Sequence, residues 1–423
     1  MKILWLVNIP LPEASSLMKE EPSPFGGWLI HASNHLANQE GIELTVAFPK
    51  NGTTSLLKLV GDKITYFAFK PVKDKDKKLI NENLDFKKIL NEVAPDLVHI
   101  YGTELAHTLS MVNVCEKEEV KTVISIQGLV SIIEKHMHAN LPCRVVYGTT
   151  LRNLVRNDNV SGLKKLFYRR GKNEVQAIKK INHIIGRTTW DKACISQINP
   201  DAKYHFCNET LREEFYKHEW NIEKCDKHSI FLSQGQYPIK GLHYVMEAMP
   251  LILKKFPDAK VYIGGKDITK SQTIIDRLLI TYYGKYIKKL IKIYRLEGNV
   301  VFTGPLNEEK MCERYLKSNV FICPSTIENS PNSLGEAMIL GVPCIASDVG
   351  GVSDMLKHKE EGFVYQADAP YMLAHYVCEI FKDDELALKF SNNARAHARK
   401  THEPMTNTNR LIEIYEDMLK KKE

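Results

Sequence analysis

The chain has 423 residues, of which 43% are hydrophobic and 26% are charged, and its formal net charge at pH 7 is +7. This length exceeds what one ordinary hydrophobic core holds, so we expect two domains of roughly 200 residues each, with a cleft between them. The composition is typical of a globular protein and argues against a disordered chain.

The cysteine pattern indicates the compartment. Nine cysteines are scattered along the chain without a CxxC spacing, which argues against a disulfide framework and against a structural zinc site. A reducing environment fits best, so we expect a cytoplasmic location. The sequence contains no apolar run of about 18 residues, so we expect no membrane-spanning helix.

Short apolar runs alternate with segments of helical period from one end of the chain to the other, which is typical of βα units in a parallel sheet. In the first half the predicted helices include Trp28–Gln39 and Phe86–Glu92, and the predicted strands are Ile3–Val7, Leu44–Phe48, Leu97–Ile100, Val123–Ile126 and His183–Gly186. In the second half the predicted strands are Ile230–Ser233, Lys260–Gly264, Val300–Thr303, Val320–Cys323, Pro343–Ser347 and Gly362–Tyr365. This α/β pattern predicts two Rossmann-like, doubly wound parallel-sheet domains.

The junction between the domains is predicted at residues 207–227, which carry many charges and few β-branched residues. We therefore expect an N-terminal domain over residues 1–212 and a C-terminal domain over residues 213–403. After Pro404, apolar residues spaced by three and four predict a last helix over residues 404–423.

The run PSTIENSPNSLGEAMILGVPCIASDVGG is the most informative part of the sequence. It places the loop Glu328–Pro331 at the carboxyl end of a predicted strand, where ligands of open α/β sheets bind. Asn332 or Ser333 can then cap a helix that runs through Glu336 to Leu340. The first amides of such a helix and its positive dipole end suit a phosphate group.

Two glutamates flank those amides. Glu328 precedes the predicted helix and Glu336 lies near its first turn, so both carboxylates can face one ligand. Carboxylates accept hydrogen bonds from vicinal sugar hydroxyls and discriminate against analogues that lack them. Gly350 and Gly351 after the next strand allow a close backbone approach to a phosphate. The pattern favours a nucleotide-sugar site; a capped helix with two solvated glutamates is the alternative.

This segment resembles the E-x7-E signature of the GT-B retaining glycosyltransferases of family four. VFTGPLNEEKM, EAMILGVPCIAS, DVGG and EEGFVY surround it in the order found in the family. The resemblance implies a GT-B fold with an N-terminal acceptor domain, a C-terminal donor domain and a last helix that packs back on the acceptor domain. It also implies that Glu336 holds the ribose hydroxyls, that the amides near Asn332, Ser333 and Leu334 hold the diphosphate, and that Glu328 holds the transferred sugar.

Lys240 in SQGQYPIKGLHYVMEAM resembles the lysine that meets the donor diphosphate in this family. A lysine beside two phosphates neutralises the charge of the leaving group. An exposed lysine at a helix start is the alternative. Family members usually carry an arginine a few residues earlier, and this chain does not. Arg187, which we also expect to line the cleft, or Lys266 could supply the second cation.

In the first half, SPFGGWLIHASNHL resembles the glycine-bearing first loop of the family, so Gly26 and Gly27 are predicted to contact the donor. Trp28 in the same run, Glu104 in VHIYGTELAH and Gln127 in VISIQGLV are predicted to line the acceptor side of the cleft. Gln127 occupies the place where many relatives have a histidine. A retaining reaction in which the leaving phosphate takes the acceptor proton can proceed without that histidine.

Other patterns do not predict sites. Asp74 and Asp76 form a D-x-D among four lysines, which indicates a solvated loop, and His31 and His35 lack a third ligand. We therefore predict no metal site. Four tyrosines within residues 282–294 have helical spacing, which favours an amphipathic helix over a nucleic-acid surface.

The segment 147–180 carries nine Lys and Arg against Asp158 and Glu174. Its apolar residues, which include Leu151, Leu154 and Val155, alternate with these cations, as in helices that lie on anionic membranes. An ordinary packed helical pair with a basic rim fits the pattern equally well.

The resemblance thus implies a retaining, metal-independent hexosyltransferase that needs no cofactor beyond its nucleotide-sugar donor. We expect a UDP-hexose as donor and a glycan or lipid-linked acceptor in bacterial surface polysaccharide synthesis. The alternatives are a nucleotide-sugar epimerase and a non-catalytic subunit that binds a nucleotide-sugar.

Overall fold

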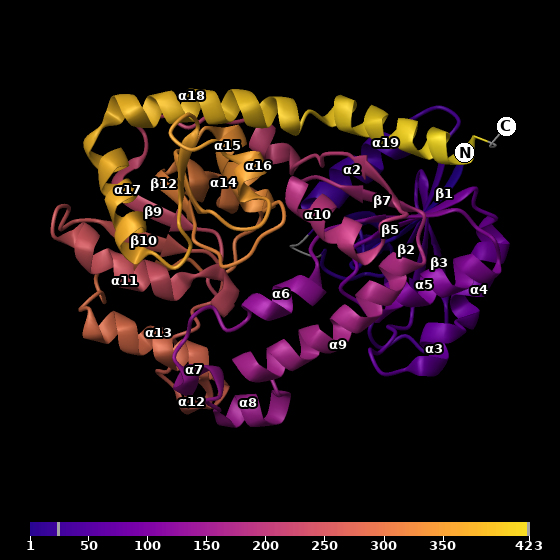
Figure 1. Ribbon diagram of the computed structural model, residues 1–423, viewed down its shortest axis with the longest axis horizontal. Helices are drawn as coiled ribbons and strands as arrows, with labels where there is room; N and C mark the ends of the chain where they lie inside the picture. The colour runs from indigo at the N-terminus through magenta and orange to yellow at the C-terminus, as the bar shows by residue number, and fades with distance from the viewer. Residues whose placement is uncertain (23–25, 421–423) are drawn as a thin grey trace. The chain divides into compact units, whose positions relative to one another are not determined.

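The computed structural model describes residues 1–22 and 26–420 and divides the chain into two compact units (Figure 1). Unit 1 comprises Met1–Ile132, Phe167–Arg212 and Thr401–Glu423, and unit 2 comprises Ile133–Leu166 and Glu213–Lys400. The first part of the predicted glycine-bearing loop and the end of the helix predicted over residues 404–423 lie outside the described residues.

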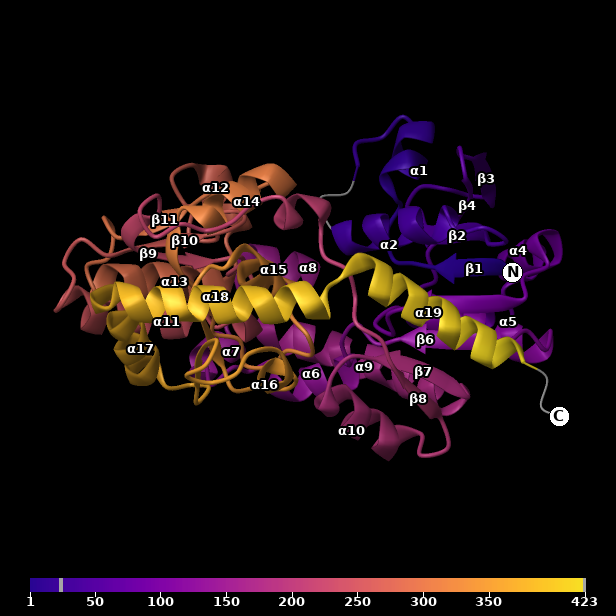
Figure 2. The same ribbon diagram turned by 90° about the horizontal axis from the view of Figure 1, so that it is seen from above.

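Unit 1 is built on an eight-stranded sheet with the order β3-β4-β2-β1-β5-β6-β7-β8, and Figure 2 labels all of these strands except β5. All neighbours are parallel except the β3–β4 pair, which is antiparallel. The strands are β1 (Lys2–Leu6), β2 (Glu43–Pro49), β3 (Leu57–Val60), β4 (Ile64–Phe69), β5 (Leu97–Tyr101), β6 (Thr122–Ser125), β7 (His183–Gly186) and β8 (Lys203–Phe206).

Helices cover both faces of this sheet. They are α1 (Pro12–Leu17), α2 (Gly27–Ala37), α3 (Lys77–Asn81), α4 (Leu84–Val93), α5 (Ala106–Lys117), α10 (Thr189–Ile198) and α19 (Pro404–Leu419), while α6 (Val130–His136) and α9 (Val160–Lys179) each contribute residues to both units. Successive side chains of a strand point to opposite faces. Accordingly, Ile3 and Trp5 belong to one buried cluster, and Leu4 and Leu6 belong to the other.

The helix α19 packs on the Trp5 face of unit 1. The Trp5 Nε1–H donates a hydrogen bond to the Tyr415 hydroxyl at 3.0 Å, and the same hydroxyl lies 2.5 Å from His99 Nδ1. All three side chains are buried. The apolar stripe read from the sequence after Pro404 is thus covered by the first sheet.

Unit 2 contains a six-stranded parallel sheet with the order β11-β10-β9-β12-β13-β14. The strands are β9 (Asp226–Leu232), β10 (Lys260–Ile263), β11 (Val300–Phe302), β12 (Ser318–Cys323), β13 (Cys344–Ser347) and β14 (Gly362–Tyr365). Strand β12 is buried along its whole length, as expected for a central strand of a parallel sheet.

The helices and turns of unit 2 include a segment from the first half of the chain. They are α7 (Cys143–Val146), α8 (Leu151–Arg156), η1 (Glu213–Tyr216), η2 (Pro238–Lys240), α11 (Leu242–Leu253), α12 (Ile274–Leu279), α13 (Tyr282–Ile293), α14 (Glu308–Leu316), α15 (Asn332–Leu340), α16 (Val352–Met355), α17 (Pro370–Lys382) and α18 (Asp384–Thr401). The sequence analysis assigned residues 133–166 to the N-terminal domain, and the structure groups them with unit 2.

Hydrogen bonds explain this difference. The Ala139 carbonyl accepts from His243 Nε2 at 2.9 Å and from the Tyr244 hydroxyl at 3.0 Å. Asn140 Nδ2 donates to Asp368 at 2.8 Å. The segment is therefore tied to α11 and to the loop after β14 by polar contacts that the sequence pattern does not reveal.

The predicted doubly wound α/β architecture is confirmed in both units. Strands β3, β4 and β8 were not predicted. Strands β3 and β8 lie at the two edges of their sheet and have exposed or half-exposed residues, so they lack the continuous apolar run of a buried strand. Within the described residues, the structure contains no helix of the length and apolar character that crossing a bilayer requires.

Candidate functional site

The strand order of unit 2 reverses beside β9. The chain moves from β9 outward to β10 and β11, and then returns to place β12 on the other side of β9. The carboxyl ends of two such strands diverge and leave a crevice, which is where ligands of open α/β sheets bind. The loops after β9 and β12 therefore form the expected ligand-binding edge of unit 2.

Lys240 and Glu328 meet at this crevice. Lys240 ends the short helix η2 after β9, Glu328 lies in the loop after β12, and the Lys240 Nζ to Glu328 Oε1 distance is 2.5 Å. The Ser325 hydroxyl donates to the same carboxylate oxygen at 2.7 Å. The two charged side chains are only 20% and 12% exposed. Burial alone lowers the pKa of Lys240, but the charge and hydrogen bond of Glu328 outweigh it, so the pKa is raised and the ammonium is kept.

The backbone holds the two loops together. The Thr326 N–H donates to the Ile239 carbonyl at 2.8 Å. Gly241 has φ +72°, and a Cβ atom at this position would lie 1.8 Å from the Pro324 carbonyl oxygen. Only glycine permits both this conformation and this approach. The position of Lys240 is therefore set by the glycine that follows it.

The loop after β13 joins the same assembly. Gly350 has φ +55°, and a Cβ atom there would lie 1.8 Å from the Glu328 carbonyl oxygen, which also accepts a hydrogen bond from the Gly351 N–H at 3.1 Å. The Ser347 hydroxyl donates to the Ser325 carbonyl at 2.5 Å. Three neighbouring strand ends thus fix the backbone of Glu328.

Helix α15 begins at Asn332, and Pro331 is its N-cap without a side-chain capping bond. The prediction that Asn332 or Ser333 caps this helix is wrong, because both residues are already helical. The Leu334 N–H donates to the Pro331 carbonyl at 2.9 Å, whereas the amides of Asn332 and Ser333 precede the first bond of this kind and lie at the positive end of the helix. Leu334 is buried, and Glu336, the fifth helical residue, is also buried.

The structure brings most of the predicted donor-binding residues onto one edge of unit 2: Lys240, Glu328, Gly350 and the start of α15. Gly26 and Gly27 belong to unit 1 instead. Gly26 has φ +77° and is the N-cap of α2, and a Cβ atom on Gly27 would lie 2.5 Å from the Arg212 side chain. These two glycines are required by the local packing of unit 1.

Unit 1 has a reversal of its own, between β1 and β5. Asn8, which follows β1, donates through Nδ2 to Glu104 Oε1 at 2.7 Å, and its Oδ1 lies 2.7 Å from His107 Nε2. The other oxygen of Glu104 is shielded from solvent and has no hydrogen-bond partner within the described residues. Burial raises the pKa of this carboxyl. Glu104 is thus a carboxylate placed at a strand end without a full set of partners.

A second polar cluster of unit 1 joins the loops after β6, β7 and β8. Glu209 lies 2.5 Å from Arg187 Nη1 and accepts a hydrogen bond from Gln127 Nε2 at 2.5 Å. Burial raises the pKa of Glu209, and the Arg187 charge opposes that rise. Trp28, Arg187 and Glu209 line a small cavity of about 40 Å³. Gln127, Arg187 and Trp28 therefore lie near one another, whereas Glu104 belongs to the other cluster.

The two predicted sources of a second cation differ in their surroundings. Arg187 is buried against Glu209 in unit 1. Lys266 is in unit 2 and lines a groove of about 840 Å³ together with Gln236 and Pro238, which belong to the loop that carries Lys240. A Cβ atom on Gly265 would lie 2.6 Å from the Gln236 side chain, so the loops after β9 and β10 touch.

Asp74 is not a solvated loop residue. Its carboxylate lies 3.1 Å from Arg170 Nε and 3.7 Å from Arg169, and its side chain is largely buried. Asp76 caps α3 by accepting a hydrogen bond from the Leu79 N–H. The D-x-D pair thus joins a helix start to α9. Among the described residues, no group of three or more His, Cys, Asp and Glu side chains is arranged to hold a metal ion.

Residues 213–397 match the family described as glycosyl transferases group 1. This part of the chain is therefore similar to the group 1 glycosyltransferases. The matched residues include Lys240, Glu328, Glu336 and Gly350, so the site at the ends of β9, β12 and β13 lies within the part that resembles this family. The match starts at residue 213, which is also the first residue of the second part of unit 2.

Known proteins support the assignment. YtcC of Bacillus subtilis strain 168, described as a glycosyltransferase, is 29% identical over 210 residues, 48% of each chain. N-acetyl-alpha-D-glucosaminyl L-malate synthase of Bacillus anthracis is 26% identical over 204 residues, 48% of this chain and 49% of that protein. The chain thus spans about half the length of the curated relatives it matches.

Solved structures resemble the chain over its whole length. Sucrose-phosphate synthase from Thermosynechococcus elongatus has a TM-score of 0.70 at 15% identity, and the alignment covers 99% of this chain and 99% of that chain. Anabaena HepE in complex with UDP and glucose has a TM-score of 0.67 at 14% identity, over 98% of this chain and 99% of that chain. The predicted GT-B fold is confirmed by these similarities.

Several residues of the two sites were missed by the sequence analysis. Ser325 and Ser347 lie within the run PSTIENSPNSLGEAMILGVPCIASDVGG. Each is close to the end of a predicted strand, and this position could have indicated a role in holding the Glu328 loop. Asn8 and His107 become partners of Glu104 only when β1 and β5 lie side by side. Glu209 follows the unpredicted strand β8, so its place at a sheet edge could not be read.

Proposed function

We propose that the chain is a retaining, metal-independent glycosyltransferase that transfers a hexose from a UDP-linked donor to a glycan or lipid-linked acceptor in bacterial surface polysaccharide synthesis. One observation carries this proposal. The ion pair of Lys240 with Glu328 lies at the strand-order reversal of the part that resembles the group 1 glycosyltransferases, beside the amide end of α15. Such a place combines a cation and amide donors for phosphate with carboxylates for sugar hydroxyls.

The donor is proposed to bind with its diphosphate between Lys240 and the first amides of α15, at Asn332, Ser333 and Leu334. Glu336 then takes the ribose hydroxyls and Glu328 takes hydroxyls of the transferred hexose. Without a donor, Glu328 is neutralised by Lys240. Donor binding would exchange this ion pair for a lysine-to-phosphate contact and a carboxylate-to-hydroxyl contact. Each charged group keeps a partner in that exchange, which limits the desolvation cost.

A second cation for the diphosphate is supplied, in this proposal, by Lys266. Its loop touches the loop of Lys240 through Gly265 and Gln236, and its groove borders the same strand ends. Arg187 is assigned to the acceptor side, because it is already engaged with Glu209 in unit 1.

The chemical step breaks the bond between the anomeric carbon and the diphosphate oxygen and forms a bond from that carbon to the acceptor oxygen on the same face. The acceptor hydroxyl proton passes to the departing phosphate oxygen, so no protein base is required. Lys240 contributes by stabilising the charge that develops on that phosphate. Fixed groups that orient the substrates contribute further.

The acceptor is assigned to unit 1. Glu104 offers an oxygen without a protein partner within the described chain, and Gln127 and Trp28 lie in the other cluster of strand-end residues. Carboxylate, amide and aromatic groups are the side chains that bind sugars through hydroxyls and ring faces.

A cytoplasmic location at the inner face of the membrane is part of the proposal. All nine cysteines are free thiols in the structure, which fits a reducing compartment. A lipid-linked acceptor would bring the enzyme to that surface.

The test is incubation of the pure protein with a panel of nucleotide-sugars, with and without a chelator. UDP release that is unaffected by the chelator and accelerated by a glycan acceptor supports the proposal, and proton NMR of the fresh product should show the donor's anomeric configuration. An isomerised sugar without acceptor would identify an epimerase, and binding without any turnover would identify a non-catalytic subunit.

A further inference from the structure

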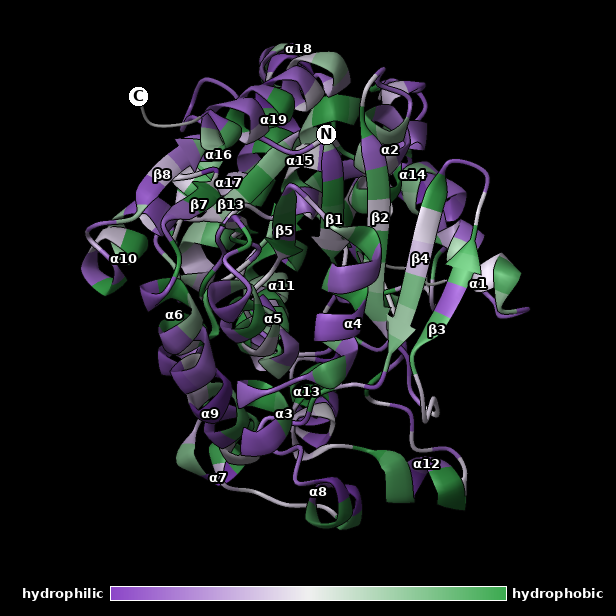
Figure 3. Ribbon diagram, turned by 90° about the vertical axis from the view of Figure 1, so that its right-hand side faces the viewer, coloured by the Kyte–Doolittle hydropathy of each residue, from purple (hydrophilic) through white to green (hydrophobic). Residues whose placement is uncertain are grey.

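Two short helices of unit 2 expose their apolar side chains to solvent. On α8, Leu151, Leu154 and Val155 are 62% to 86% exposed, and on α12, Ile274, Ile275 and Leu278 are 45% to 76% exposed. We call these six residues the α8–α12 platform. The two helices contact each other, and Figure 3 shows apolar residues on both. Scattered apolar residues on a surface are ordinary, but a contiguous group on neighbouring helices indicates an interaction site.

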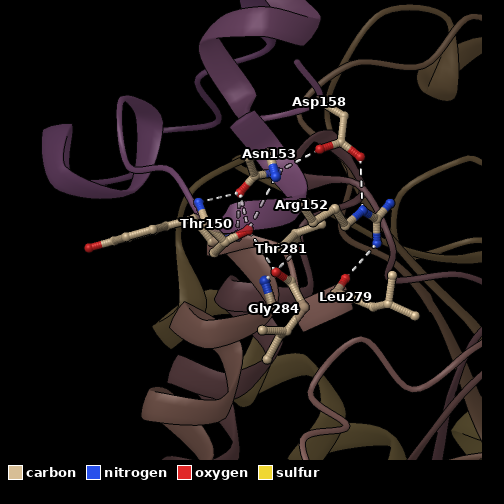
Figure 4. Close-up of polar contacts among 9 residues, drawn as sticks. Thr150, Arg152, Asn153, Asp158, Leu279, Thr281 and Gly284 are labelled. Carbon is tan, nitrogen blue, oxygen red and sulfur yellow. Dashed lines mark hydrogen bonds and ion pairs between the residues drawn. The ribbon is translucent and has the colours of Figure 1, made fainter. Parts of the chain in front are cut away.

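Helix α8 is attached to the body of unit 2 by its polar side chains (Figure 4). The Thr150 hydroxyl donates to the Ile280 carbonyl at 2.8 Å, and Asn153 Oδ1 accepts from the Tyr282 N–H at 3.0 Å. Both polar side chains are buried. A surface helix normally buries its apolar face and exposes its polar face. Helix α8 does the reverse, so its apolar side chains point away from the protein.

Arg152 completes the attachment. It donates through Nη1 to the Leu279 carbonyl at 3.1 Å and through Nε to Asp158 at 3.0 Å, and Asp158 also accepts from Asn153 Nδ2 at 2.7 Å. These bonds, drawn in Figure 4, fix α8 against the end of α12. The platform is therefore a defined surface rather than a loosely held loop.

Helix α12 contains no buried residue. Its start is stabilised by a capping box, in which the Thr273 hydroxyl accepts from the Asp276 N–H at 3.1 Å and Asp276 accepts from the Thr273 N–H at 3.0 Å. Helices of this length are marginal in water unless they pack on something. An apolar helix that is capped but not covered by its own fold is suited to a partner outside the chain.

The platform is surrounded by positive charge. Residues 147–166 and 266–292 contain eleven Lys and Arg against three Asp and no Glu. Each Asp accepts hydrogen bonds from its own neighbourhood: Asp158 from Arg152 and Asn153, Asp276 from Thr273, and Asp267 from Thr269. Arg156, at the end of α8, is exposed and makes no ion pair with a carboxylate of the described chain. The exposed charge that a partner meets is thus strongly cationic.

We propose that the α8–α12 platform docks on an anionic lipid bilayer, with its six apolar side chains at the acyl boundary and the surrounding Lys and Arg at the headgroups. A bilayer with anionic headgroups offers apolar area and negative charge together, and this combination matches the two features of the platform. A purely apolar protein partner would leave the cations unused, and an acidic one would leave the apolar residues uncovered.

The docking surface also adjoins the donor side of unit 2. The groove of about 840 Å³ is lined by Arg152 and Arg156 of the basic surroundings and also by Gln236 and Lys266 of the strand-end loops. If the chain acts on lipid-linked acceptors, a step that rests on the proposed function, docking at the platform brings the membrane surface to the mouth of this groove.

The docking is tested by sedimentation of the full chain with vesicles of phosphatidylcholine alone and of phosphatidylcholine mixed with phosphatidylglycerol. We expect binding to the anionic vesicles that weakens at high salt. The double variant Leu154→Asn and Ile275→Asn should bind at least about tenfold more weakly. Because both side chains are exposed, the variant should unfold at the same temperature as the wild-type protein. The control is Leu388→Asn, at an exposed leucine of α18 in the same unit.

A further variant, Arg156→Ser, tests the charge without disturbing the Arg152 attachment and should reduce binding to anionic vesicles, whereas Lys389→Ser on α18 should not. Equal vesicle binding by the wild-type protein and the double variant would overturn the proposal. Self-association of the lipid-free protein that the double variant abolishes would also overturn it, because the platform would then be an interface between copies. Vesicle binding and UDP release are measured separately, so failure of the proposed transfer leaves the docking result intact.

Discussion

Replacing Gly350 with alanine should disturb the site and destabilise unit 2. The new Cβ atom would lie 1.8 Å from the Glu328 carbonyl oxygen. Either the Glu328 loop or the turn at Gly350 must move, and the hydrogen bond from Gly351 N–H to that carbonyl must stretch or break. The side chain of Glu328 would then leave its position beside Lys240.

Three contributions set the expected size of the effect. A left-handed conformation costs a non-glycine residue about 1–2 kcal/mol. Loss of the hydrogen bond from Gly351 costs about 1 kcal/mol, and the displacement of a packed loop costs about 1–3 kcal/mol. The free energy of unfolding of unit 2 should therefore fall by roughly 3–6 kcal/mol. At about 2–4 °C per kcal/mol for a domain of this size, the unfolding temperature should fall by at least about 6 °C.

Calorimetric unfolding and titration with UDP-glucose measure the two consequences. The control is Gly52→Ala in unit 1, at φ +81° with no atom within 4 Å of the new Cβ, which measures the cost of the conformation alone in the unit that lacks Gly350. We expect Gly52→Ala to lose about 1–2 kcal/mol and to bind the donor normally. Equal losses of stability in the two variants, or normal donor binding by Gly350→Ala, would refute the reasoning.

Three further predictions concern the polar groups of unit 1. Burial raises the pKa of Glu104, so unit 1 should lose stability as pH rises through that pKa. The variant Glu104→Gln should therefore be more stable than the wild-type protein by about 1 kcal/mol at pH 7, and equally stable below the ordinary pKa of a glutamate. Urea titrations at both pH values measure the difference. Burial lowers the pKa of His99 to about 3, so the free energy of unfolding should fall as pH drops from about 6.5 toward 3. In His99→Gln, the slope of the free energy of unfolding against pH in this range should decrease by at most about 1.4 kcal/mol per pH unit. The same slope in both proteins would contradict this. Arg187→Met leaves Glu209 buried without its cation and should lower the free energy of unfolding by about 3–5 kcal/mol. Adding Glu209→Gln to the same chain should restore most of this loss. A double variant that is as unstable as the single variant would exclude this explanation.

The parts of the fold that depend on local pattern could be predicted from the sequence. The strand His183–Gly186 has the predicted bounds, because it is a short β-branched run between turn signals, and α15 ends at Leu340 as expected before Gly341. The edge strand β8 was missed, since its residues Lys203–Phe206 alternate only weakly between polar and apolar. Burial patterns predict central strands better than edge strands.

The contacts within the site could not be predicted, because they join residues far apart in sequence. Lys240 and Glu328 are separated by 88 positions and meet because β12 returns to the side of β9. Likewise, residues 133–166 join unit 2 through Ala139 and Asn140, which have no distinctive pattern. The residue types of the site could be read from the sequence, whereas their partners required the strand order.

The helix start at α15 shows a local limit. Serine and asparagine are the usual N-cap residues, and both follow Pro331 directly. Proline nevertheless takes the N-cap position, with φ −69° and ψ 112°, and the two polar residues enter the helix. The first turn is therefore left without a side-chain cap, which suits a ligand that supplies the acceptors.

The central claim is that Lys240 stabilises the leaving diphosphate of a nucleotide-sugar. The most direct test measures UDP release from a UDP-hexose with a glycan acceptor, for the wild-type chain, Lys240→Ala and the surface control Lys389→Ala. We predict that Lys240→Ala lowers the turnover number by at least about 100-fold while Lys389→Ala keeps the wild-type rate. Full activity in Lys240→Ala would contradict the account.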